Sequence, residues 1–570
     1  MNNLKKIVTI IISVIVPAVV IGQNSMSGKS NRSYMHHEQK DDNYNPGGTP
    51  DLGTLPGYKF ESSLVFITQV NVDENGNNII GDAANEPSIA IDPTDPNRMV
   101  IGWRQFDDVG NNFRQAGYGY TSDGGETWNF PGVIEPGVFR SDPGLDADSE
   151  GRFYYNSLTK DDVPTYWCNV YRTEPGGFIW DEGAFAQGGD KQWMVIDRSG
   201  GMGDGHIYSF WTSSYSYCYP GAFTRSIDGG NSYEDCVITD GDPYWGTMAV
   251  GPEGELYIAG SGSWDGIIVA KSTNAQNSAN NVTWDSYTLV NMDGYLTGWT
   301  EINPAGLLGQ ANVCVDASGG PGNGNIYVLA SVARNSGSDP ADVMFSRSTD
   351  GGANWSEPQR INDDLGWSDY QWFGTMSVAP NGRIDVVWLD TRDDPSGNTL
   401  SALYYSYSLD EGLTWSANEK LSDIFHPHIG WPQQEKMGDY FDMESDVSSA
   451  HLAWASTLNG EQDIYYARIT PQLTGTDKPI AKMDDLMISS YPNPFKDKTT
   501  IRYTLQSDSE VKILVTDVFG RRIKDLVNEH QTSGFHEISI SAADLPVGIS
   551  YCRIVAGSQT KTINLSRIDK

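Results

Sequence analysis

Four arginines stand where short apolar segments begin or end, and their chemistry suits the binding of an acidic ligand. Arg104 follows "VIGW", Arg334 follows "LASVA", Arg392 follows "VVWLDT", and Arg140 precedes "SDPGL". A guanidinium group pairs with carboxylates in a planar, bidentate geometry that an ammonium group does not match. We therefore treat these four side chains as candidate substrate-binding residues. The alternative is that they are ordinary solvated arginines at the rim of the fold.

Carboxylates and one phenol occupy the same kind of position. Glu86, Asp142, Asp390 and Tyr370 flank the same apolar segments, and Asp107, Asp190 and Asp439 do so too. Side chains of these types supply the general acids, bases and nucleophiles of catalysis. We take Asp142, Asp390, Tyr370 and Glu86 as candidate catalytic residues.

Aromatic residues give a second signal at these segment ends. Trp245 and Trp372 are the main examples, accompanied by Trp193, Tyr244, Trp264 and Trp367. Exposed aromatic rings stack on sugar rings at low cost in side-chain entropy. Trp245 and Trp372 are therefore candidate sugar-binding residues, and ordinary packing between sheets is the alternative.

Length, composition and charge limit the class of protein. A chain of 570 residues exceeds one ordinary domain, and its 61 glycines and 11% aromatics, without helical periodicity, favour many short strands. The net charge of −36 argues against nucleic acid or an anionic membrane as partner.

The N-terminal segment predicts export. Residues 1–22 combine a basic start with an apolar core, as in a cleaved signal peptide, and residues 23–60 are polar and aperiodic, a flexible lead-in. No transmembrane segment is expected after cleavage. Among the five cysteines, Cys218 and Cys236 flank a repeated turn and could form a disulfide.

An acidic, glycine-rich turn that ends in an aromatic residue recurs along the chain. Its copies place Asp123, Asp228, Asp350 and Asp410 at equivalent positions, and degenerate copies fall at 171–180 and 271–284, where Asn274 replaces the aspartate. The carboxylate can accept hydrogen bonds from backbone N–H groups of the turn, and the second glycine tolerates positive φ. The turn is therefore expected to be structural.

A second repeat marks the start of each unit. Short strand openings begin at residues 87, 143, 193, 246, 311, 374 and, weakly, 438. The repeat region stops one strand short, and residues 62–70 could supply the missing strand. This pattern describes a ring of four-stranded blades, with seven favoured over six, closed by a strand from the other end of the region.

The acidic turn resembles the Asp-box (BNR repeat) of the sialidase-like β-propellers. The match is full at 121–128, 348–355 and 408–415, and has Tyr233 for tryptophan at 226–233. The resemblance implies a β-propeller at 61–470, with these turns between the third and fourth strands and on the face opposite the ligand. It also implies an arginine clamp for a sugar carboxylate, an aspartate acid/base and a tyrosine nucleophile.

One departure from that family keeps the function open. The family's Arg-Ile-Pro signature is absent from the first unit, which reads "NEPSIAID". The expected function is a secreted glycoside hydrolase of the sialidase type acting on exposed glycans. The alternatives are a non-catalytic glycan- or protein-binding propeller, and a uronate polysaccharide lyase that uses His428 with Tyr370 and Arg392. No cofactor is clearly indicated, and calcium is the metal that the acidic turns at 146–151 and 390–394 would suit.

The C-terminal segment has a different sequence pattern from the repeat region. The phrases "YPNPF" (491–495), "DVFGR" (517–521) and "LPVG" (545–548) resemble the type A C-terminal sorting domain of type IX secretion in Bacteroidetes. Residues 488–570 are expected to form a small Ig-like β-sandwich after a linker at 471–487. The resemblance implies the type IX secretion machinery as a partner, and a secreted or outer-membrane-surface location.

Overall fold

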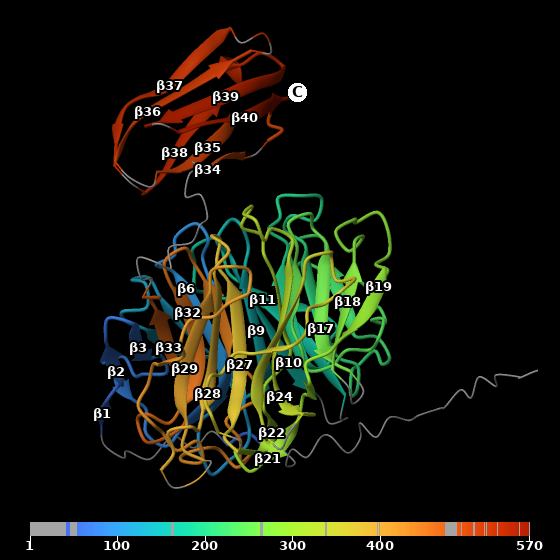
Figure 1. The fold of residues 1–570 in the computed structure, drawn as a ribbon, viewed down its shortest axis with the longest axis vertical. Coiled ribbons are helices and arrows are strands. Elements are labelled where there is room, and N and C mark those ends of the chain that lie inside the picture. The colour runs from blue at the N-terminus through green and yellow to red at the C-terminus, as the bar shows by residue number, and fades with distance from the viewer. Residues whose placement is uncertain are drawn as a thin grey trace, which may run out of the picture.

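The computed structural model describes residues 41–45, 54–472 and 487–568, with gaps at 161–164, 263–265, 337–338, 367, 396, 398, 492, 497, 506–507, 518, 520, 533 and 558. The predicted signal peptide, most of the lead-in and most of the linker lie outside these residues, as do Trp264 and Trp367. Within the described residues, strands dominate and the one helical element is a 3₁₀ turn, Ala542–Asp544 (Figure 1). The all-β prediction is confirmed.

Antiparallel sheets follow one another along the chain. The first sheet consists of β5 (Ala83–Ile91), β6 (Met99–Phe106), β7 (Gln115–Thr121) and β8 (Asn129–Ile134), and the second of β9 (Ser141–Ala147), β10 (Phe153–Lys160), β11 (Tyr166–Arg172) and β12 (Ala184–Phe185). The third sheet consists of β13 (Asp190–Ile196), β14 (Ile207–Thr212) and β15 (Phe223–Ser226). The fourth consists of β16 (Met248–Val250), β17 (Leu256–Ser261), β18 (Ile267–Ser272) and β19 (Ser286–Val290).

Three further sheets complete this part of the chain. The fifth sheet consists of β23 (Asn312–Val315), β24 (Ile326–Arg334), β25 (Asp342–Ser348) and β26 (Gln359–Arg360), and β20 (Gly294–Tyr295) also pairs with β24. The sixth consists of β27 (Gln371–Val378), β28 (Ile384–Asp390), β29 (Ala402–Ser408) and β30 (Glu419–Lys420). The seventh consists of β31 (Asp442–Ser445), β32 (Ala450–Ser456), β33 (Asp463–Ile469), β3 (Val65–Gln69) and β2 (Lys59–Glu61). Two small pairs, β1 (Leu55–Pro56) with β4 (Asn77–Asn78) and β21 (Gly298–Thr300) with β22 (Asn303–Leu307), are separate.

The first strands of these sheets contact one another in chain order. β5 lies beside β9, and the succession continues through β13, β16, β23, β27 and β31, which lies beside β5 again. Polar side chains join neighbouring first strands: Asp442 Oδ2 accepts from Ile89 N at 3.1 Å, and Asp146 Oδ2 accepts from Ile196 N at 2.7 Å. Such bonds satisfy backbone groups that no strand pairing within one sheet can reach.

The last sheet joins the two ends of the repeat region. β3 pairs antiparallel with β33, with Ile67 opposite Ala467. The prediction that residues 62–70 supply the missing strand is therefore confirmed. All seven strand openings found in the sequence also fall in or immediately before a first strand, from β5 to β31.

The acidic turns carry the predicted hydrogen bonds. Each of the four carboxylates accepts from the hydroxyl two residues before it and from the backbone N–H four residues after it; for Asp410 these donors are Ser408 Oγ at 3.0 Å and Thr414 N at 2.8 Å. Asn274 takes the same role, accepting from Ser272 Oγ and Thr283 N. The turns at 121–128, 348–355 and 408–415 join the third and fourth strands of their sheets, as expected.

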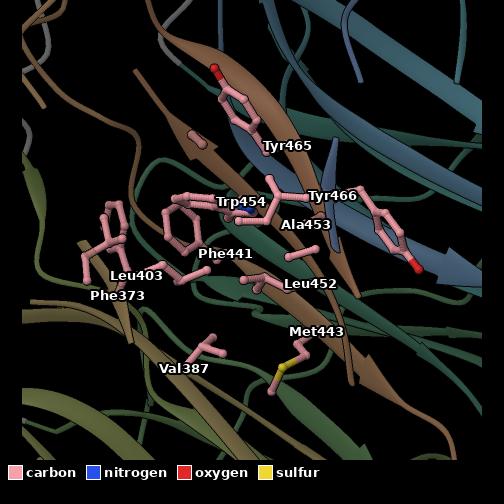
Figure 2. Packing of buried hydrophobic residues seen from close by; sticks show 14 of the residues in the cluster. Phe373, Val387, Leu403, Phe441, Met443, Leu452, Ala453, Trp454, Tyr465 and Tyr466 are labelled. Carbon is pink, nitrogen blue, oxygen red and sulfur yellow. The ribbon is translucent and has the colours of Figure 1, made fainter. Parts of the chain in front are cut away.

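Apolar side chains fill the space between the sheets. Figure 2 shows part of the largest cluster, in which the rings of Phe373 and Phe441 pack edge to face with centroids 4.7 Å apart. Close approach requires small residues at some contacts. A Cβ at Gly102 would stand 2.4 Å from the ring of Tyr155 on the next sheet, so only glycine fits there.

Two antiparallel sheets make up the C-terminal part. They are β34 (Met487–Tyr491), β35 (Lys498–Leu505) and β38 (Gly534–Ser541), and β37 (Arg522–Gln531), β36 (Ser509–Thr516), β39 (Gly548–Ala556) and β40 (Gln559–Arg567). Alternate residues such as Val511, Ile513 and Val515 are buried in one apolar core. This period of two is the pattern of a sheet with one face on the core.

Candidate active site

A residue with left-handed backbone lies near or a few positions before the start of the first strand in each of these seven sheets. These residues are Glu86 (φ 50°), Asp142 (48°), Lys191 (55°), Trp245 (56°), Gly309 (134°), Phe373 (56°) and Gly438 (96°). Pairing with the second strand shifts register at Glu86, Asp142, Lys191 and Phe373. Non-glycine residues in this conformation are strained by about 1–3 kcal/mol and concentrate at functional sites.

One buried cluster contains two lysines and three carboxylates, all of them left-handed residues of this set or residues close to one in the chain. Lys191 Nζ lies 2.7 Å from Asp439 Oδ2 and 3.4 Å from Asp142 Oδ2. Lys436 Nζ lies 2.8 Å from Asp439 Oδ2 and 3.4 Å from Glu86 Oε1. None of these side chains is more than 6% exposed, so the Coulomb attraction between their charged groups acts at low dielectric.

Arg104 joins this cluster from the end of β6. Its Nε lies 3.2 Å from Glu86 Oε2 and donates to Asn85 Oδ1 at 2.8 Å, and its Nη2 donates to Gln434 Oε1 at 2.9 Å. Of the residues predicted from the sequence, the structure thus brings together Glu86, Asp142, Asp439 and Arg104. It adds Lys191 and Lys436, which sequence reasoning missed.

The cluster separates the pKa values of its carboxyl groups. Burial raises the pKa of Glu86 to about 8, although Arg104 and the two lysines oppose this. Burial also disfavours the ionised form of Asp439, but the ammonium groups of Lys191 and Lys436 hold the pKa of Asp439 well below its usual range. The two shifts have opposite directions: the surroundings favour the protonated form of Glu86 and the ionised form of Asp439. Such a pair can divide acid and base roles.

The hairpin β21–β22 contacts the segment that carries Asp439. Leu307 N donates to Asp439 Oδ1 at 2.8 Å, Asn303 Nδ2 donates to Gly438 O at 2.9 Å, and Met437 N donates to Asn303 Oδ1 at 2.9 Å. These bonds hold the hairpin over the cluster; Figure 1 shows it at one end of the sheets. Glu86 itself is fully buried in this conformation.

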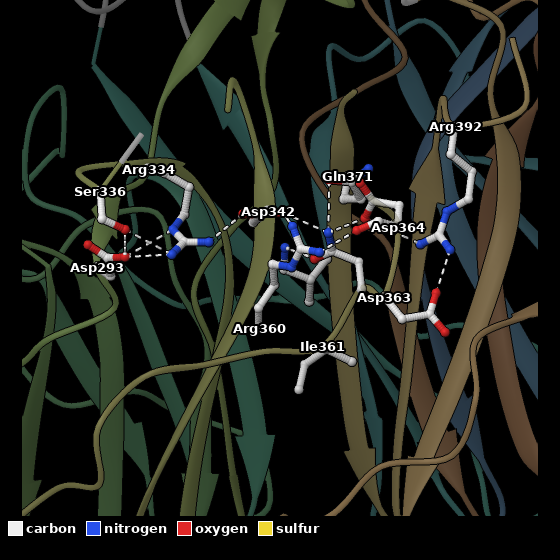
Figure 3. A network of polar contacts seen from close by, with 12 residues as sticks. Asp293, Arg334, Ser336, Asp342, Arg360, Ile361, Asp363, Asp364, Gln371 and Arg392 are labelled. Atoms are coloured by element: carbon white, nitrogen blue, oxygen red, sulfur yellow. Dashed lines mark hydrogen bonds and ion pairs between the residues drawn. The ribbon is translucent and has the colours of Figure 1, made fainter. Parts of the chain in front are cut away.

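The other predicted arginines are engaged elsewhere. Arg334 pairs with Asp293 and Asp342, and Arg392 pairs with Asp363 (Figure 3). Arg392 also pairs with Asp390. A single network runs between the two arginines, because Arg360 contacts Asp342 and also donates to Asp364 O, while Asp364 lies 3.6 Å from Arg392. Arg140 pairs with Glu135 and Asn169.

Asp390 belongs to this network through Arg392, and Tyr370 directly precedes Gln371 in the chain. Asp390 accepts from Trp388 Nε1 at 2.8 Å and from Gln371 Nε2 at 3.2 Å. Tyr370 is half-buried, and burial followed by the charge of Glu301 raises its pKa. A raised pKa disfavours the phenolate that a tyrosine nucleophile needs.

The two predicted aromatic platforms are packed inside the protein. Trp372 is fully buried, with Nε1 donating to Ser401 Oγ at 3.2 Å. Trp245 is 7% exposed, and its ring packs edge to face on Tyr244 and Trp299. Neither indole offers a free ring face in this conformation.

His428, proposed for the lyase alternative, also has local partners. Its Nε2 lies 3.0 Å from Ile302 O, and its ring stacks on Trp431. Burial lowers its pKa, which keeps the imidazole neutral at pH 7. A neutral imidazole is the form that a general base requires.

Metal ligation has little support within the described ranges. There, no group of three or more His, Cys, Asp or Glu is arranged to hold a metal ion. In the acidic turn at 146–151, Asp146 pairs with Arg198, and Asp148 accepts from Glu150 N and Arg152 N. These oxygens are already engaged by protein groups.

The predicted disulfide is present, joining Cys218 to Cys236. It ties the loop after β14 to the chain beyond β15.

Comparison with known proteins identifies the C-terminal part. Residues 489–566 match the secretion system C-terminal sorting domain. This confirms the sorting-domain resemblance and means that the protein is exported by type IX secretion to the cell surface or the extracellular space. Over the residues that the structure describes, we find no helix with the length and hydropathy of a membrane span.

No curated protein matches the chain. Among solved structures, a Dyadobacter fermentans protein of unknown function is 13% identical, with a TM-score of 0.41 over 71% of this chain and 98% of its own. The phage phi92 endosialidase is 8% identical (TM-score 0.38, 88% and 87%), and a PL25 ulvan lyase is 10% identical (0.36, 68% and 94%). At these TM-scores the function has to be argued from the site itself.

Proposed function

We propose that residues 61–470 form a seven-bladed, sialidase-like β-propeller that hydrolyses glycans outside the cell, with Glu86 as its general acid. The fold proposal is supported by the succession of sheets, by the acidic turns between third and fourth strands, and by the pairing of β3 with β33. Export by type IX secretion is consistent with a substrate outside the cell.

The shared contact of Glu86 and Asp439 with Lys436 carries the catalytic proposal, and the opposite directions of their pKa shifts support it. Glycoside hydrolysis uses one protonated carboxyl group to protonate the leaving oxygen and one carboxylate as nucleophile or base. Glu86 fits the first role. Asp439, which Lys191 and Lys436 orient, fits the role of nucleophile or base. Asp142 also contacts Lys191.

A glycan screen with the full-length exported protein tests this proposal. The panel contains sialylated oligosaccharides, arabinan and a uronate-rich polysaccharide, and new reducing ends are measured. We expect Glu86→Gln, which keeps the shape of the side chain, to lower kcat/KM at least about 100-fold without changing the melting temperature. Glu135→Gln, which removes the partner of Arg140, is the matched control and should retain activity.

Other outcomes would overturn the assignment. Equal turnover by wild type and Glu86→Gln would exclude Glu86 as the acid. Released sialic acid that is lost in Arg392→Ala would place the chemistry at the Arg392 network instead, and an unsaturated uronate product would indicate the lyase alternative.

A non-catalytic glycan- or protein-binding propeller is the second candidate. The observation that favours it is that Glu86 is fully buried and already contacts Arg104 and Lys436. Retention of a glycan without any product would support this candidate.

A further inference from the structure

The loop between β14 and β15 exposes aromatic rings that no catalytic argument has used. Tyr217 is 59% exposed and Tyr219 is 71% exposed, and Phe185 of β12, at 45%, lies against Tyr217 with ring centroids 5.6 Å apart. These side chains come from two adjacent sheets. Two of these rings are in contact, and Tyr219 is exposed two residues further along the same loop. Exposed aromatic rings gathered in one region mark a surface that can bind a ligand.

The backbone beneath these rings is fixed. Cys218 is bonded to Cys236, Tyr217 N donates to Tyr166 O at 2.9 Å, and Ser216 Oγ donates to Gly188 O at 2.7 Å. The indole of Trp211, fully buried, donates from Nε1 to Ser216 Oγ and to Gly221 O. A ligand that binds here would therefore order only side chains and not the loop, which lowers the entropic cost of binding.

The loop also lies at the same end of its sheet as the buried cluster. Asp190, which precedes Lys191 in β13, pairs with Thr212 at the end of β14. The loop begins at the next residue. A long ligand that lies on the exposed rings would thus be held at the end of the sheets where the Glu86 cluster is located.

We propose that Phe185, Tyr217 and Tyr219 form a binding surface for the sugar rings of a neutral polysaccharide. Tyrosine suits this ligand because its face stacks on the C–H groups of a pyranose while its hydroxyl bonds to sugar hydroxyls. The three rings bring no positive charge, and the net charge of −36 repels anionic polymers. This proposal goes beyond the hydrolase assignment and holds whether or not Glu86 is a catalytic acid.

Affinity electrophoresis of the full-length protein tests the proposal. Native gels contain mixed-linkage β-glucan, galactomannan or arabinoxylan, with polygalacturonate as the anionic comparison. We expect retarded migration in at least one neutral gel and none in polygalacturonate. Tyr217→Ala/Tyr219→Ala should weaken the retardation about tenfold, expressed as the polysaccharide concentration for half-maximal effect.

Two controls separate ring stacking from a general structural defect. Tyr217→Phe/Tyr219→Phe keeps the rings and should retain most of the binding. Tyr287→Ala, which removes a tyrosine that is 56% exposed on β19, should leave binding unchanged. The double alanine variant must keep the wild-type melting temperature; if it does not, Phe185→Ala, outside the loop, is used in its place.

Three results would overturn the proposal. They are the absence of retardation in every neutral gel, retardation in polygalacturonate alone, and undiminished retardation of the folded alanine variant. The binding proposal and the hydrolase proposal can fail separately. If Glu86→Gln abolishes product formation but still binds polysaccharide, binding at Phe185, Tyr217 and Tyr219 does not depend on catalysis.

Discussion

At the scale of single residues, burial decides the protonation of several carboxyl groups. Glu444 resembles Glu86 in that burial raises its pKa to about 8, here against the opposing charge of Arg198. Unfolded glutamate titrates near pH 4.3. Between about pH 4.5 and 8 the folded protein therefore keeps protons that the unfolded chain releases.

This difference predicts that the free energy of unfolding falls as pH rises from about 5 to 8. Glu444→Gln removes one of the groups responsible and should make the decline shallower. Urea unfolding at pH 5, 6.5 and 8 measures the slope, with the exposed Glu253→Gln as control. An unchanged slope in Glu444→Gln would show that Glu444 is ionised in the folded state.

The aspartate of each acidic turn is expected to stabilise its hairpin. Asp410→Ala removes the bonds to Ser408 Oγ, Thr414 N and Thr414 Oγ1, and should lower the free energy of unfolding by about 1–2 kcal/mol without affecting any glycan activity. Chemical denaturation and an activity assay check both parts. Glu357→Ala, an exposed residue that follows another acidic turn, should be neutral; reduced glycan activity in folded Asp410→Ala would assign the turn a role beyond support.

At the scale of elements, the disulfide fixes the loop that carries Tyr217 and Tyr219. The double variant Cys218→Ser/Cys236→Ser removes a disulfide between residues that are 18 positions apart. It should lower the free energy of unfolding by about 3 kcal/mol. Limited proteolysis should then cut near 213–221, and mass spectrometry of the fragments locates the site. Resistance equal to that of the wild type would mean that the hydrogen bonds of Ser216 and Trp211 suffice to hold the loop.

Elements with local chemistry could be predicted from the sequence, and the site could be predicted only in part. The acidic turns and strand openings are readable because each turn's bonds join residues within a few positions, and even Asn274 was identified. The bulges were not identified, because Glu86 and Lys191 take left-handed backbone without a glycine to signal it. The inward position of Lys191 and Lys436 depends on contacts between sheets, which no local pattern encodes.

At the scale of the whole molecule, the proposal of a closed β-propeller rests on the pairing of two strands that are far apart in the sequence. Ile67 of β3 is fully buried opposite Ala467 of β33. Ile67→Ala should cost about 3 kcal/mol and Ile67→Val about 1 kcal/mol in free energy of unfolding. Urea titration followed by tryptophan fluorescence measures both. Equal stability of the alanine variant and the wild type would show that β3 contributes little to the fold.

The pairing of β3 with β33 also sets the order of events during synthesis and export. The last sheet cannot form until residues near 469 have been synthesised. The edge of β3 that pairs with β33 therefore stays unpaired while some four hundred residues follow it. Closing so long a loop is slow, and an open strand edge invites association with other chains. The edge of β3 is therefore most exposed to association with other chains in the interval before residues 463–469 appear.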